Sequence, residues 1–240
     1  MINYKQLTAK TMPPEKKRTA SKCIIGHYLL RPISNVISIP LIEWGVNPTP
    51  VTIVSGIFPL LAFLFFFLLP NSVGFWLGWL SILVWNILDG VDGNIARYCQ
   101  KTSPRGGVWD ATVGWLAMVV FYSGMGLVAY YNFGTSVLDS NIKDFWYILM
   151  GDAAAMCWIF PRLVMHKTIN TVSKEAAHAV QDRGDYGFGK LLFFNITSIN
   201  GGAAVIFVLC YMMHLTSECM AFYFIISLFV ACGSLYKLLK

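Results

Sequence analysis

Hydrophobic residues are concentrated in six long runs that follow a mixed segment of about fifty residues. The first run, Val51–Leu69, contains 19 uncharged residues, which is long enough to cross a hydrocarbon layer of roughly 30 Å as a helix. In lipid the backbone must satisfy its own hydrogen bonds, and the runs are too long and too uniform for barrel strands, so each is predicted to be a helix. The other runs are Phe75–Tyr98, Gly107–Tyr131, Phe145–Met165, Leu191–Leu215 and Met220–Leu239.

The composition agrees with a chain that has lipid as its solvent. Apolar residues make up 56% of the sequence and charged residues 12%, about half the share usual in soluble domains. These values exclude a soluble globule, and they disfavour a disordered or collagen-like chain and a protein that binds nucleic acid through a basic face. We therefore expect an all-α integral membrane protein with six transmembrane helices and an N-terminal interfacial amphipathic segment.

The placement of the basic residues indicates the topology. Lys and Arg lie before the first run, between the second and third, between the fourth and fifth, and after the sixth, whereas the opposite connections contain only Lys143. By the positive-inside rule both termini are predicted to be cytoplasmic. The net charge of +6 is then explained by topology and by attraction to anionic lipid, without a nucleic-acid partner.

Two parts are expected along the chain. Residues 1–50 form a cytoplasmic N-terminal segment, in which Cys23–Trp44 is predicted to contain one or two short helices lying in the membrane interface, an ordinary connector being the alternative. Residues 51–240 form the six-helix transmembrane domain. No cleavable signal peptide is expected, because charges are spread through the first fifty residues. The polar stretch Thr168–Gly187 is predicted to be a cytoplasmic loop.

Three carboxylates lie at the cytoplasmic edge of the predicted membrane domain, where an ionised acid is costly unless it is paired, hydrated or bound to metal. Asp89 and Asp92, three residues apart, share one helical face at the end of the second span. The short connector makes the next span an antiparallel neighbour, so Asp110 at its start can face this pair. Three converging carboxylates favour Mg²⁺, Mn²⁺ or Ca²⁺ over zinc. In the alternative interpretation the acids pair with Arg97 and Arg105 and hold the helices together.

Small residues flank these acids. Gly90, Gly93 and Ala96 let backbone approach a bulky ligand or a second helix, and Gly106 lies near the start of the third span. Arg97 follows one turn after Gly93 and could grip a phosphate. Taken alone, the glycines favour helix packing over a ligand site.

The pattern Asp89-x-x-Asp92-Gly93-x-x-Ala96-Arg97, eight residues, then Gly106-x-x-x-Asp110, resembles the hallmark of the CDP-alcohol phosphotransferase (CDP-alcohol phosphatidyltransferase) family. The resemblance implies a membrane enzyme that moves a phosphoalcohol or phosphatidyl group from a CDP-linked donor to an acceptor hydroxyl and releases CMP. It further implies a place in the biosynthesis of phospholipids or related glycerolipids. CDP-diacylglycerol with a polar acceptor and a small CDP-alcohol with a lipid acceptor both fit.

Carried over by position, the resemblance implies a two-metal site at the cytoplasmic side. Two divalent cations, Mg²⁺ or Mn²⁺, would bind Asp89, Asp92 and Asp110, with Asp92 and Asp110 also in the catalytic set, and Gly93, Ala96, Arg97 and Gly106 would line the CDP pocket. Such ions neutralise the diphosphate and stabilise the leaving CMP. The family also implies a homodimer, and a lipid tail could enter sideways from the bilayer.

One position departs from the family pattern, which continues to a fourth aspartate that acts as base and metal ligand. Gly114 occupies this position. Loss of a general base typically lowers the rate about 10²–10⁴-fold, and loss of a ligand would weaken the second metal site. Three interpretations follow: a variant with another proton acceptor or an already ionised acceptor substrate, a form inactivated to trap substrate, or a pseudoenzyme that binds a CDP-linked ligand without turnover.

Other polar groups lie in or beside the later spans. Asp152, in the middle of the fourth span, could partly replace the missing base or contact a polar acceptor, the alternative being a helix-packing acid. Arg162, His166 and Lys167 could hold an anionic acceptor, or simply reach the interface. A transporter that uses intramembrane acids is the rival class of function. The clustering of the acids at one edge disfavours it.

Overall fold

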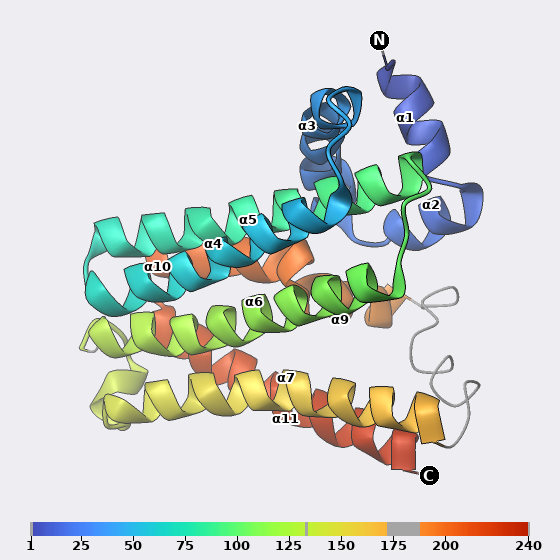
Figure 1. The fold of residues 1–240 in the computed structure, drawn as a ribbon. Helices are drawn as coiled ribbons and strands as arrows, with labels where there is room; N and C mark the ends of the chain where they lie inside the picture. The colour runs from blue at the N-terminus through green and yellow to red at the C-terminus, as the bar shows by residue number, and fades with distance from the viewer. Residues whose placement is uncertain (1, 133, 172–187, 240) are drawn as a thin grey trace.

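The computed structural model describes residues 2–132, 134–171 and 188–239, and this part of the chain contains helices and no strand, as predicted. Five helices are long and apolar enough to cross a membrane. They run the length of the molecule in Figure 1, with short N-terminal helices at one end. The five are α4 (Pro48–Leu68), α5 (Ser72–Tyr98), α6 (Pro104–Tyr131), α7 (Phe145–Thr171) and α11 (Thr216–Leu239). The integral membrane class is thereby confirmed.

The fifth predicted span is broken. It consists of α9 (Phe188–Thr197), the π-helical turn η3 (Ile199–Ala203) and α10 (Ala204–Met212), with a bend of 59° at the break. This differs from the uninterrupted helix expected over Leu191–Leu215. Two residues leave the helical conformation here: Ser198, at the break itself, is extended with φ of −80° and ψ of 132°, and Gly201, beside a second glycine, has φ of −101° and ψ of −128°. Glycine weakens helices, and the bent pair gives a sixth crossing only when it is counted as one span.

Side chains from other helices satisfy the carbonyls near this break. The Tyr223 hydroxyl donates to the carbonyl of Ile196 at 2.8 Å, and the Tyr122 hydroxyl donates to that of Thr197 at 3.1 Å. The Trp79 indole N–H donates to the carbonyl of Ala204 at 3.0 Å. Irregular backbone at membrane depth is tolerated only where protein or water satisfies it, so α5, α6 and α11 together stabilise the bend.

The N-terminal segment contains more helix than the sequence indicated. The predicted helices within Cys23–Trp44 are present as the π-helical turn η1 (Gly26–Leu30) and α3 (Arg31–Glu43). Two earlier helices, α1 (Tyr4–Thr11) and α2 (Pro14–Ala20), were not anticipated. The start of α1 carries a capping box between Asn3 and Gln6, a local signal that could have revealed it. The depth of these helices in a membrane stays a prediction.

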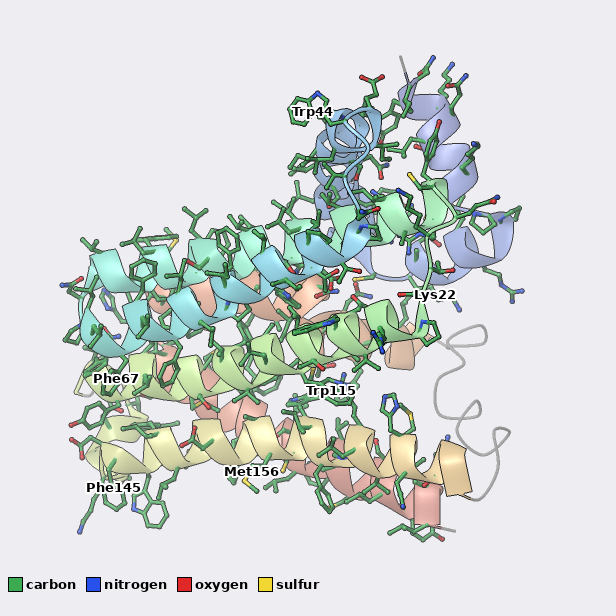
Figure 2. All side chains as sticks on the ribbon, viewed as in Figure 1. Lys22, Trp44, Phe67, Trp115, Phe145 and Met156 are labelled. Carbon is green, nitrogen blue, oxygen red and sulfur yellow. The ribbon has the colours of Figure 1, made fainter. Side chains whose placement is uncertain are left out.

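The outer surface of the long helices is strongly apolar. Figure 2 shows Met156 and Phe145 directed away from the bundle, and 71% of the Met156 side chain is exposed. Soluble proteins do not expose so many large apolar side chains along long helices, so this surface is suited to lipid. The polar loop predicted at Thr168–Gly187 lies almost wholly outside the described residues; its first residues continue α7 to Thr171.

Candidate active site

The three acids lie at the end of the bundle that carries the N-terminal helices (Figure 1). Asp89 and Asp92 come from the last part of α5 and Asp110 from the second turn of α6. The carboxyl groups of Asp89 and Asp110 are hydrogen-bonded to each other, and the charge of Asp92 acts on Asp89. Asp92 is only 4% exposed, whereas Asp89 is half-buried and Asp110 is exposed. The acids thus span from the protein interior to an open edge.

Thr52 in α4 is a neighbour of Asp92 that sequence reasoning missed. Its hydroxyl donates to Asp92 Oδ2 at 2.5 Å, and both side chains are buried. The bond fixes one carboxylate oxygen of Asp92. A single threonine in an apolar run gave no signal of this role, because its partner is forty residues away along the chain.

Arg97 lies against Gly93 one turn earlier on α5. A Cβ atom built on Gly93 would come within 2.8 Å of Arg97 Nη2, so glycine is what allows the guanidinium to lie here. Arg97 Nη2 donates to Asn94 Oδ1 at 3.4 Å. Among the hydrogen bonds of the described residues, Arg97 thus donates to an amide oxygen. The positive charge of Arg97 still acts on all three acids. Whether the acids pair with Arg97 and Arg105 to hold the helices together stays an alternative interpretation.

The three acids have the oxygen donors that a hard divalent cation prefers, although they are not arranged as a complete set of metal ligands. Within residues 2–132, 134–171 and 188–239, no three His, Cys, Asp or Glu side chains are placed to hold a metal ion as they stand. Asp89 and Asp110 nevertheless touch, Asp92 lies one turn away, and all donors are oxygens, the set that Mg²⁺ and Mn²⁺ prefer.

The start of α6 and position 114 are open. Ser103 caps α6 by accepting a hydrogen bond from the N–H of Gly106 at 3.0 Å. Gly114 lies one turn after Asp110 on the same helix, and a Cβ atom there would meet no other atom within 4 Å. The Cβ atom of an aspartate would therefore fit at this position without displacing a neighbour. Ala96, the remaining small residue of the motif, is half-buried on α5.

Asp152 lies far from this cluster. It accepts a hydrogen bond from Ser123 Oγ at 2.6 Å, and Ser123 is thirteen residues after Asp110 on α6. At about 1.5 Å of rise per residue, this places Asp152 roughly 20 Å along the bundle from Asp110. Proton transfer needs hydrogen-bond distance, so the separation disfavours Asp152 as a replacement for the base missing at Gly114, which lies nine residues before Ser123. That Asp152 partly replaces this base or contacts a polar acceptor stays a prediction.

The cationic end of α7 lies beside α6. Arg162 donates to the carbonyl of Trp158 at 2.8 Å and lies over its ring at 5.8 Å. His166 packs edge-on against Trp115, the residue after Gly114, with ring centroids 5.2 Å apart. Figure 2 shows Trp115 between α6 and α7. These contacts bring the end of α7 near position 114, and a role in holding an anionic acceptor stays a prediction for Arg162, His166 and Lys167.

The N-terminal segment also reaches the site. Ser34 in α3 donates to the carbonyl of Ile87 at 2.8 Å, and a Cβ atom on Gly90 would come within 2.5 Å of Ser34 Oγ. Gly90 therefore admits a second helix, one of the two uses expected of it. Burial lowers the pKa of Arg31, and the nearby charge of Asp89 partly opposes this. The first span and α3 thus both contact α5, the helix that carries Asp89 and Asp92.

A known protein family accounts for nearly all of the membrane part of the chain. No protein of curated function matches the sequence. The family model described as CDP-alcohol phosphatidyltransferase matches residues 46–233, which include the site and nearly all of the long helices. Members of this family are membrane transferases that take a phosphoalcohol group from a CDP-linked donor to a hydroxyl acceptor. The chain belongs to the CDP-alcohol phosphatidyltransferase family.

Proposed function

We propose that this protein is a divalent-metal-dependent transferase that moves a phosphoalcohol or phosphatidyl group from a CDP-linked donor to an acceptor hydroxyl and releases CMP. The observation that carries the proposal is the contact between Asp89 and Asp110, which joins carboxyl groups of two antiparallel helices beside Asp92. Carboxylates gather in this way where a cation or a shared proton relieves their repulsion. The reaction class comes from the family, and the three acids are where we propose that the reaction occurs.

Asp89, Asp92 and Asp110 would hold one or two Mg²⁺ or Mn²⁺ ions, with the second site weakened by Gly114. Bound ions would neutralise the donor's diphosphate and stabilise the leaving CMP. Thr52 holds Asp92 in place, and Arg97 offers a planar cationic fork to phosphate oxygens. Gly93, Ala96 and Gly106 keep the surrounding backbone accessible to the nucleotide.

The alternative is a binding protein of the same family without turnover. It is favoured by one observation, the open position at Gly114, where the family pattern has a base. An acceptor that is already ionised, or another proton acceptor, would restore turnover. These interpretations differ in a single measurable property, the effect of an acid placed at position 114.

The site would work at the cytoplasmic face in the biosynthesis of phospholipids or related glycerolipids. In Figure 1 the last residues of α11 and the N-terminal helices lie at the same end of the bundle as the acids. The basic residues of the sequence assign that end to the cytoplasm. A homodimer in the membrane is part of the same proposal.

The test is release of CMP from a panel of CDP-linked donors by the purified protein in lipid vesicles. We expect release with Mg²⁺ or Mn²⁺ and none with a chelator, and a loss of at least about 10²-fold in Asp89→Asn and Asp110→Asn. Asp144→Asn is the matched control, because Asp144 accepts a hydrogen bond from the N–H of Phe145 in the connection after α6. Proton-coupled flux without nucleotide affinity would instead support the transporter.

The Gly114→Asp variant separates the remaining interpretations. A large gain in CMP release would identify position 114 as a lesion in an ordinary transferase. Unchanged release in a native chain that already turns over would mean that a different base acts. Metal-dependent nucleotide binding with no CMP release from either form would establish the binding-only alternative.

A further inference from the structure

The interfacial helix α3 turns its polar side chains inward. Ser34, Asn35 and Ser38 are all buried, whereas Val36 on another face is 60% exposed. An amphipathic helix on a protein surface ordinarily does the opposite, because a buried polar group needs a partner to offset its lost hydration. Each of these side chains has one partner on α5, and those partners identify what the buried face contacts.

Asn94 of α5 is the centre of this contact. Its Nδ2 atom donates to Asn35 Oδ1 at 2.9 Å and to Ser38 Oγ at 3.1 Å. Ser38 Oγ in turn donates its own hydrogen to the carbonyl of Ser34 at 2.6 Å, so it can only accept from Asn94. Asn35 Nδ2 donates to the Tyr4 hydroxyl at 3.3 Å, which leaves Asn35 Oδ1 as the acceptor. Both hydrogens of the Asn94 amide are therefore used on α3.

With its nitrogen fixed in this way, Asn94 presents its oxygen to Arg97. Arg97 Nη2 donates to Asn94 Oδ1 at 3.4 Å, and the guanidinium lies over Gly93. A neutral amide orients a guanidinium without cancelling its charge, as a carboxylate in the same place would. Because a guanidinium is a planar fork, its orientation decides whether it can contact two phosphate oxygens at once.

We propose that Asn94 is a positioning residue, which the buried polar face of α3 anchors and which orients Arg97 for the diphosphate of the nucleotide. This inference rests on the proposed function, since it assigns to Arg97 the phosphate of a CDP-linked donor. It adds that the N-terminal segment is part of the binding machinery through Asn35 and Ser38. A role in packing alone would make the same hydrogen bonds without affecting nucleotide affinity.

The test measures the dissociation constant of CDP, by titration calorimetry of the full chain in detergent with Mn²⁺. Asn94→Ala should weaken CDP binding about tenfold, the usual scale for a lost hydrogen bond to a charged group. Ser38→Ala, which leaves Asn94 and Arg97 in place, should weaken it in the same direction by about twofold to fivefold. Asn86→Ala is the matched control, a buried asparagine two turns earlier on α5, and should leave CDP binding unchanged.

A double-mutant cycle distinguishes positioning from packing. In an Arg97→Ala background, Asn94→Ala should change CDP affinity less than about twofold, because the group it orients is gone. Equal effects in both backgrounds would overturn the inference, as would unchanged CDP affinity in Asn94→Ala. If Asn94→Ala does not fold, Ser38→Ala decides by the same criterion. No metal-dependent CDP binding by the native chain would overturn the proposed function and this inference together, whereas tight binding unaffected by either variant would overturn this inference alone.

Discussion

At the scale of single residues, Thr52 tests whether the carboxylate of Asp92 is a metal ligand. Thr52→Val removes the hydroxyl that donates to Asp92 Oδ2 and changes the volume little. Partners that hold a ligand in place typically account for about 10–100-fold in metal affinity, so we expect a loss of that size. The measurement is Mn²⁺ binding followed by electron paramagnetic resonance.

Thr112→Val is the control for this substitution. Thr112 lies on α6 two residues after Asp110 and is exposed. Its hydroxyl donates to the carbonyl of Val108 on the same helix. We expect unchanged Mn²⁺ affinity in this variant. An equal loss in both variants would indicate a general disturbance of the helices. No loss in Thr52→Val would mean that Asp92 needs no fixed orientation to bind Mn²⁺.

The individual residues of the site were predictable where they are close in sequence. The spacing of Asp89, Asp92 and Asp110 on two neighbouring helices indicated their proximity, which needs only helical periodicity and a short connector. Thr52 was missed because Asp92 is forty residues away along the chain, and Asn94 because the side chains of α3 that anchor it are more than fifty residues away. Contacts at such separations depend on tertiary packing, which no local pattern of residue types specifies.

At the scale of the helices, α6 and α7 pack backbone against backbone at two glycines. A Cβ atom on Gly126 would come within 2.6 Å of the carbonyl oxygen of Tyr147, and one on Gly151 within 2.7 Å of that of Tyr122. Backbone cannot give way as a flexible side chain does. Membrane helices associate through such small residues because lipid offers them little hydrophobic gain.

We therefore expect Gly126→Val to lower the free energy of unfolding by about 1–3 kcal/mol, the usual range for an overpacked contact. Thermal unfolding in detergent, followed by tryptophan fluorescence, measures the change. Gly233→Val is the matched control on α11, because a Cβ atom at Gly233 meets nothing within 4 Å. Equal stability of the two variants would show that α6 and α7 can separate without loss.

The existence of the helices followed from the apolar runs, whereas the break in the fifth span did not. The glycine pair Gly201–Gly202 was the only local sign of it. What stabilises the bend is a set of donors from three other helices, such as the Tyr223 hydroxyl on the carbonyl of Ile196. Hydropathy measures whether a segment prefers lipid, and it carries no information about a carbonyl satisfied from elsewhere in the bundle.

At the scale of the whole molecule, the N-terminal segment is joined to the broken fifth span. Asn195 Nδ2 donates to the carbonyl of Lys22 at 2.7 Å, and its Oδ1 accepts from the N–H of Ile24 at 2.8 Å. Cys23 Sγ donates to the carbonyl of Asn200 at 3.2 Å. The N-terminal segment and the broken fifth span therefore contact each other at the end of the bundle that carries the acids. These contacts link the order of the N-terminal helices to the order of the site.

The opposite end of the molecule is joined by Asp139, which lies in the 3₁₀ turn η2 (Leu138–Ser140) between α6 and α7. Asp139 Oδ2 accepts from the N–H groups of Gly134, Thr135 and Ser136. Its Oδ1 accepts from the hydroxyls of Tyr147 in α7 and Ser217 in α11, both at 2.7 Å. One carboxylate thus joins a connection between two helices to the start of a third.

Burial raises the pKa of Asp139, but the hydrogen bonds from Tyr147, Ser217 and the backbone outweigh it, so the net pKa is lowered. A carboxyl whose pKa is lower in the folded than in the unfolded state stabilises the fold above the unfolded value of about 3.9. This stabilisation is lost as the pH falls through the folded value. Asp139→Asn should therefore lower the Tm in detergent at pH 7, and the difference in Tm from the native chain should shrink below about pH 4.

Asp144→Asn, in the same connection, is the control and should show no such pH-dependent difference, since Asp144 accepts from the N–H of the adjacent Phe145 and an asparagine can do the same. A Tm difference for Asp139→Asn that stays constant down to pH 3 would mean that the charge of Asp139 contributes nothing and that its shape alone matters. Because the acids of the site lie at the other end of the bundle, CDP binding at pH 7 should persist in Asp139→Asn below its Tm, which separates the stability of the molecule from the chemistry of the site.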